Sequence, residues 1–191
     1  MARGSQEREQ AFIETAKPET GHTIDEWMAI IEAAGLDLKP NTILKHLKAN
    51  HDLNHMQANY LAGMYLNDGQ PVYDYAVLYA RLYDGKDHLR PLIDTLQAQA
   101  DALFDDVVFV PTRNYISIEG HKIFACAKLT KKSVRVGLDL GDIPFEGRVQ
   151  KAKGLGAMPN LSHMIEIDSV DDIDDAFLGS FRHAFDRVHN S

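Results

Sequence analysis

Residues 107–140, VVFVPTRNYISIEGHKIFACAKLTKKSVRVGLDL, decide the fold of this chain. Apolar and polar residues alternate along this stretch, which predicts a small sheet with one buried face. We predict four strands, at residues 107–110, 114–119, 121–129 and 133–140. The tight turns expected at residues 119–120 and 130–132 indicate antiparallel pairing, because short turns cannot join parallel strands.

Helices are predicted on both sides of these strands. Thr23, with Glu26 three residues later, forms a capping box that starts one helix, and Asn54 is a suitable cap for another. Six helices are expected before the strands, near residues 10–16, 24–34, 41–50, 55–64, 75–82 and 88–104. A long loop at 141–159, a strand at 161–167 and a final helix capped by Ser169 are expected after them. This order is typical of an α+β protein, with a helical domain at 10–86 and an α+β domain with an antiparallel sheet at 87–191.

Several passages resemble two known families. The segments TGHTIDEWMAIIEAAG (20–35) and KHLKANHDLNHMQANYLA (45–62) resemble a bacterial helical domain of unknown function, family 4287. The segment LYDGKDHLRPLIDTL (82–96), together with the strands and SVDDID (169–174), resembles its usual C-terminal partner, domain of unknown function family 5655. The resemblance implies the two-part architecture and brings no established activity or catalytic residues. Members of the second family often carry several basic residues at the first hairpin, where this chain has EGH at 119–121.

Charge is unevenly distributed along the 191 residues. The whole chain has a net charge of −8, but residues 107–160 contain nine basic and four acidic residues, which gives +5. An acidic protein should not adhere broadly to nucleic acid, whereas its basic segment can bind an anion locally. No apolar run approaches the roughly 18 residues that span a bilayer, and the N-terminus lacks the apolar core of a signal peptide. We therefore expect a cytoplasmic protein without membrane partners.

The sheet provides the best candidate site. Alternation places one set of strand residues on the buried face and a more polar set on the other face, where arginine and lysine beside aromatic rings suit phosphate contact and base stacking. A second basic group lies in the loop GRVQKAKGLG at 147–156, whose backbone amides and basic side chains can hold a phosphate. The predicted ligand-binding residues are Arg113, Tyr115, Lys122, Phe124, Lys128, Arg135, Arg148, Lys151 and Lys153. The alternative is that helices cover this face, the lysines only fringe it, and the loop is a mobile solvated segment.

Three functions remain open at this point. The sequence favours a non-enzymatic binding protein that holds an anionic ligand or a protein partner. The second hypothesis is a nucleic-acid-binding protein, although the helix expected from Asn54 has no lysine or arginine for phosphate contact. The third is an enzyme that uses His121, His163 or Cys126, and it rests on residue types alone.

The sequence predicts no catalytic residue, no metal site and no cofactor. Cys126 is the only cysteine, which excludes an internal disulfide and favours a small packed hydrophobe. His51 and His55 are four residues apart, but the helix is expected to start between them, so a structural role is favoured over metal binding. A homodimer is compatible with the sequence.

Overall fold

The computed structural model describes residues 4–155 and 161–189. The chain folds as two compact units that divide between Asp74 and Tyr75. The α+β prediction is confirmed, because a helical part is followed by an antiparallel sheet with flanking helices. None of the helices in the described part of the chain is long and apolar enough to cross a membrane.

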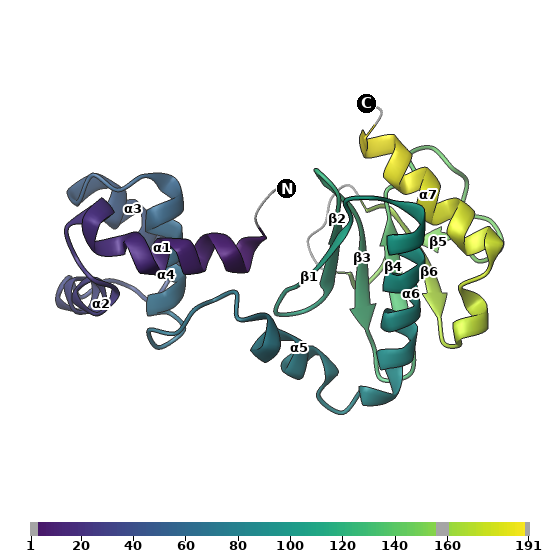
Figure 1. The fold of residues 1–191 in the computed structure, drawn as a ribbon, viewed down its shortest axis with the longest axis horizontal. Helices are drawn as coiled ribbons and strands as arrows, with labels where there is room; N and C mark the ends of the chain where they lie inside the picture. The colour runs from purple at the N-terminus through teal and green to yellow at the C-terminus, as the bar shows by residue number, and fades with distance from the viewer. Residues whose placement is uncertain (1–3, 156–160, 190–191) are drawn as a thin grey trace. The chain divides into compact units, whose positions relative to one another are not determined.

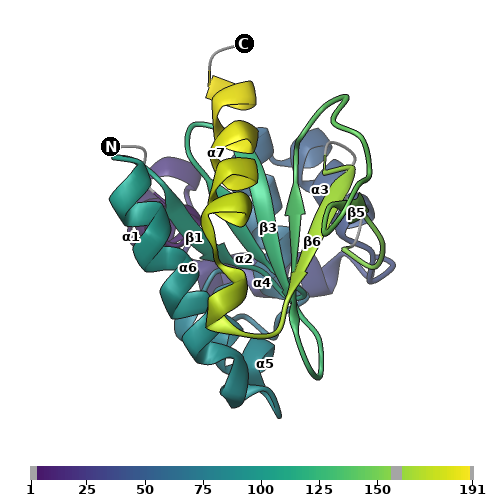
Figure 2. The same cartoon turned by 90° about the vertical axis from the view of Figure 1, so that its right-hand side faces the viewer.

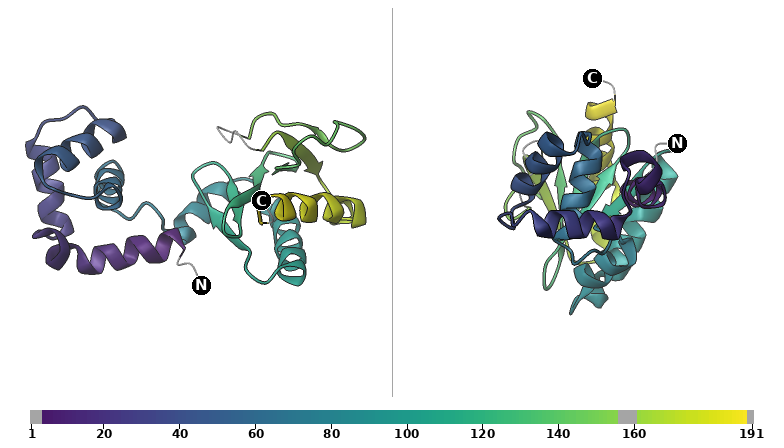
Figure 3. Two further views of the ribbon diagram at one scale, coloured as in Figure 1. Left: turned by 90° about the horizontal axis from the view of Figure 1, so that it is seen from above. Right: turned by 90° about the vertical axis from the view of Figure 1, so that its left-hand side faces the viewer.

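The N-terminal unit consists of helices, shown face-on in the right-hand view of Figure 3. These are α1 (Ser5–Thr20), α2 (Ile24–Ala33), α3 (Pro40–Asn50) and α4 (His55–Tyr65). Trp27 lies at the centre of their core with 1% of its surface exposed, and its indole N–H donates to Thr20. Both predicted caps are present, since Thr23 and Asn54 each form a capping box. Helix α1 is longer than predicted, because it continues through Pro18.

The boundary between the units lies earlier than the expected one at 86. Helix α5 (Tyr75–Tyr83) belongs to the C-terminal unit, where it contacts the first strand. The Tyr79 hydroxyl donates to the carbonyl of Phe109 on that strand. The sequence placed α5 with the helices before it because its own periodicity does not identify the surface against which it packs.

The C-terminal unit is built on one antiparallel sheet with the strand order β1-β2-β3-β4-β6-β5. The strands are β1 (Val108–Pro111), β2 (Ile116–Glu119), β3 (Ile123–Leu129), β4 (Val134–Leu138), β5 (Gln150–Lys151) and β6 (His163–Ile167). Strand β5 lies within the predicted loop 141–159, of which residues 156–159 are outside the described part of the chain. A two-residue strand carries too little alternation to be recognised from sequence.

Two helices cover one face of this sheet, as Figures 1 and 2 show. They are α6 (Arg90–Leu103) and α7 (Asp175–His189), preceded by the short 3-10 turns Asp87–Leu89 and Val170–Asp172. Ser169 caps the second of these turns rather than α7, and Asp174 accepts a hydrogen bond from the Phe177 amide at the start of α7. The main core of the unit lies between these helices and the sheet.

A β-bulge reverses the predicted orientation of two neighbouring side chains. The pairing of β2 with β3 shifts between Ile118 and Glu119, so Ala125 and Ile123 face consecutive residues of β2. Phe124 is fully buried on the helix side, 5.2 Å from the Phe181 ring, whereas Ile123 is 41% exposed. Phe124 therefore lies in the core and is removed from the candidate binding face.

Candidate functional site

The second face of the sheet, opposite α6 and α7, has a small apolar cluster of its own. Ser117, Cys126, Gly137 and Met164 lie in one row across β2, β3, β4 and β6. Leu155 packs over this row, and a Cβ at Gly137 would lie only 2.5 Å from its Cδ1 atom. The close approach requires glycine at 137 and holds the segment after β5 against the sheet.

Basic side chains gather at one end of this second face. Lys128 of β3 and Arg135 of β4 are directly opposite cross-strand partners. Tyr115 precedes Ile116, whose partner is Ala127, so the register places Tyr115 beside Lys128. We call this area the basic end, which comprises Arg113, Tyr115, Lys128, Lys131, Lys132 and Arg135.

Arg135 is the central cation of the basic end. Its side chain is 30% exposed, and its Nε lies 3.6 Å from Glu166 Oε1. This nitrogen is buried and has no hydrogen-bond acceptor among the described residues. The carboxylate of Glu166 is shared, because the Ser133 hydroxyl also donates to Oε1. The positive charge of Arg135 is therefore only partly balanced.

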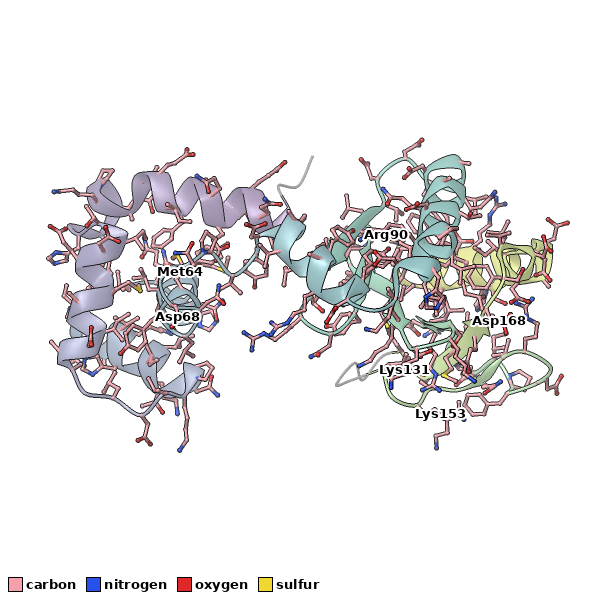
Figure 4. All side chains as sticks on the ribbon, turned by 90° about the horizontal axis from the view of Figure 1, so that it is seen from below. Met64, Asp68, Arg90, Lys131, Lys153 and Asp168 are labelled. Carbon is pink, nitrogen blue, oxygen red and sulfur yellow. The ribbon has the colours of Figure 1, made fainter. Side chains whose placement is uncertain are left out.

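The segment after β5 brings further cations towards Arg135. A Cβ at Gly154 would lie 3.2 Å from Arg135 Nη1, so the guanidinium rests against this glycine. Lys153 precedes it, and Figure 4 shows Lys153 and Lys131 on the opposite side of the unit from Arg90 of α6. Neither lysine side chain forms an ion pair in the part of the chain that the structure describes.

Lys151 and Lys153 also line a cavity of about 230 Å³ at the β5 edge of the sheet. Its remaining lining residues are Phe145, Ala152, Gly154, Leu155, Leu161 and Ser162. The two lysines are exposed, and the leucines form an apolar wall that continues into the cluster above Cys126. The cavity thus combines apolar walls with two cations.

Other predicted site residues do not join the basic end. Arg148 donates to Asp174 Oδ2 over 2.9 Å and to the Asp172 carbonyl over 2.7 Å, so its charge holds the turn before α7. The backbone amide of Asp168, helped by the amide of Ser169 and the ion pair with Arg148, holds the pKa of Asp172 below its usual range. Lys122 is exposed at the opposite end of β3 from Lys128.

Comparisons with known proteins agree with this architecture. A family model for a domain of unknown function, DUF5655, matches residues 80–187. The chain belongs to the DUF5655 family. A second model for a domain of unknown function, DUF4287, matches residues 9–67, so both predicted resemblances are confirmed in their expected order. No curated protein and no solved structure matches the chain.

The three residues of the enzyme hypothesis are dispersed within the DUF5655 part. Burial raises the pKa of the Cys126 thiol to about 11, so it remains protonated near neutral pH. Cys126 faces the second face, whereas His163 pairs with Leu138 and points to the helix side. The amide of His121 donates to Nε2 of His189, which lies in the last turn of α7.

The histidines do not form a metal site among residues 4–155 and 161–189. His51 caps the C-terminus of α3 and packs edge-on against Trp27, with ring centroids 5.2 Å apart. His55 begins α4, which follows the predicted cap at Asn54. His51 thus packs against the core of the N-terminal unit, whereas His55 is exposed at the start of α4.

Sequence reasoning missed two parts of the site. Glu166 lies 31 residues after Arg135 in the chain, and only the pairing of β4 with β6 identifies it as the counter-ion. Phe145 lies in a loop, as the sequence predicts, but the sequence does not indicate that its half-exposed ring forms one side of the cavity. The adjacent lysines 131 and 132 are the available signal for more charge at this end of the sheet, although the sequence predicts only a turn there.

Proposed function

We propose that the C-terminal unit is a non-enzymatic binding module that holds an anionic ligand at the basic end of the sheet. The observation that carries this proposal is the pairing of Lys128 directly opposite Arg135, with Glu166 as a shared counter-ion. Like charges on opposite strands repel each other, at a cost of about 0.2–1 kcal/mol. A bound phosphate or carboxylate relieves that repulsion and accepts charge-assisted hydrogen bonds.

The surroundings of Arg135 favour binding over catalysis. A guanidinium binds phosphate or carboxylate through a planar set of donors and stays charged at any physiological pH. The thiol of Cys126 stays protonated, and the imidazole of His163 uses both nitrogens in hydrogen bonds within the fold. We also propose that the protein is bacterial and cytoplasmic, and its resemblance to a bacterial family supports the first part of this proposal.

Binding of pyrophosphate at low salt, measured by isothermal titration calorimetry, tests this proposal. Arg135→Gln should weaken binding about tenfold or more, because a hydrogen bond to a charged group contributes about 1.5–3 kcal/mol. The matched control is Arg182→Gln on the exposed side of α7, which removes the same charge and should leave the affinity unchanged. Circular dichroism checks that both variants are folded.

The outcomes separate the candidate ligands. Equal weakening in both variants would show that only the overall charge matters, which refutes the site. No binding of pyrophosphate or of labelled single- and double-stranded DNA and RNA at low salt also refutes it. Saturable nucleic-acid binding that weakens steeply with salt and requires Arg135 identifies the ligand as nucleic acid.

A further inference from the structure

The cavity beside β5 has the size of a single aromatic ring. An engineered apolar cavity of about 150 Å³ binds benzene, and drug-sized ligands occupy about 300–1,000 Å³. The cavity here measures about 230 Å³, which leaves room for one ring and a small substituent. Leu155 and Leu161 form its apolar wall, and each is 4% exposed.

Phe145 provides an aromatic surface that is fixed in place. Its ring packs on His163 with centroids 4.7 Å apart, yet 52% of the residue remains exposed. His163 Nε2 lies 2.7 Å from the Ile143 carbonyl, and a carbonyl only accepts, so Nε2 carries the proton. In the neutral ring Nδ1 therefore accepts from Ser162, 2.8 Å away. These bonds anchor the Phe145 segment to β6.

The position of the cations complements these apolar walls. Lys151 and Lys153 are both exposed and line the cavity. Neither side chain forms a hydrogen bond or ion pair with another residue in the described ranges. Gly154, between Lys153 and Leu155, has a φ of +69° and rests against Arg135. The left-handed turn at this glycine directs Leu155 back onto the sheet and leaves Lys153 exposed.

We propose that this cavity binds a small aromatic ligand that carries one anionic group. The ring lies against Phe145 and the two leucines, and a phosphate or carboxylate lies beside Lys151 and Lys153. This inference rests on the proposed function, because it names the class of ligand that would bind beside Arg135, at the cavity lined by residues 151–155. It adds the requirement for a ring, which anion binding by the basic end does not need.

Phenyl phosphate is the probe that tests the inference, with inorganic phosphate and phenol as its two halves. Calorimetry gives each affinity, and saturation-transfer NMR reports contact of the phenyl protons with the protein. We expect phenyl phosphate to bind at least about tenfold more tightly than inorganic phosphate, since burial of one ring contributes about 1.5–3 kcal/mol. Phe145→Ala should remove this gain and leave the affinity for inorganic phosphate unchanged.

Additional variants keep the test informative if Phe145→Ala perturbs the loop. Phe145→Leu keeps an apolar side chain and should lose only part of the gain, and Lys153→Gln should weaken both phosphates. Val170→Ala removes a similarly exposed apolar side chain elsewhere in the unit and should change nothing. Arg182→Gln serves again as the charge control.

Two results distinguish failure of this inference from failure of the proposed function. If phenyl phosphate binds no more tightly than inorganic phosphate, or if Phe145→Ala leaves the gain intact, the aromatic ligand class is overturned while the anion site stands. If neither phosphate, pyrophosphate nor a nucleic acid binds, the proposed function is overturned as well.

Discussion

Alanine substitutions at Ile123 and Phe124 test the bulge that shapes the binding face. Alternation alone predicts that Ile123 is inside and Phe124 outside, whereas the structure reverses them. Phe124 is fully buried and packs against Phe181 and Phe185 at centroid distances of 5.2 and 5.3 Å. Phe124→Ala should therefore cost about 3–5 kcal/mol of unfolding free energy. Ile123 is already 41% exposed, so Ile123→Ala should cost less than about 1.5 kcal/mol.

Urea unfolding followed by far-UV circular dichroism measures both changes. With an m-value of about 2 kcal/mol/M, the midpoint should fall by about 2 M for Phe124→Ala and by less than about 0.8 M for Ile123→Ala. Trp27 is the only tryptophan and lies in the N-terminal unit, so its fluorescence reports the unfolding of that unit and distinguishes it from the unfolding of the C-terminal unit. Equal midpoints, or a larger loss for Ile123→Ala, would refute the bulge and return Phe124 to the binding face.

Three further outcomes are expected from buried groups. The Glu9 carboxylate accepts hydrogen bonds from two backbone amides, but burial has the largest effect and raises the pKa of Glu9 above its ordinary value of 4.5. Glu9 therefore contributes stability below pH 4.5, and this contribution is lost as the pH rises through the folded-state pKa. Urea unfolding monitored by Trp27 fluorescence should therefore show a stability gap between wild type and Glu9→Gln that shrinks with rising pH, and a gap that does not change with pH would contradict this effect. Cys126 should react with a thiol reagent only after urea unfolds the sheet, and rapid reaction of the native protein would contradict its burial. Gly137→Ala should cost about 1–3 kcal/mol in urea unfolding, because the new methyl group displaces the side chain above it; an unchanged midpoint would show that this packing is loose.

The local signals of the chain predicted most elements of the fold. Thr23 and Asn54 start helices because each side chain accepts from a backbone amide three residues later, a contact that needs no distant partner. The strands of 107–140 were recognised from alternation and from short turns. Resemblance supplied the division into two families, which the family models confirm.

The candidate site depended more strongly on contacts distant in sequence. In the sequence Arg148 is an ordinary basic loop residue. In the structure its guanidinium donates hydrogen bonds to Asp172 and Asp174, which lie more than 20 positions away. Lys128 and Arg135 are paired by a hairpin that the sequence did predict, so this part of the basic surface could be predicted from the sequence. The role of their surface as a binding site stays a prediction.

The sequence by itself determined which residues favour helix, strand and turn, because those preferences arise from neighbouring backbone and side-chain groups. Tertiary structure decided which face Phe124 occupies, since the one-residue shift between β2 and β3 is set by pairing between the strands and by packing beneath α7. It also decided that α5 packs against β1 and that Phe145 lines one side of a cavity. Periodicity specifies only that a side chain alternates, whereas the register of the pairing strand specifies the side to which it points.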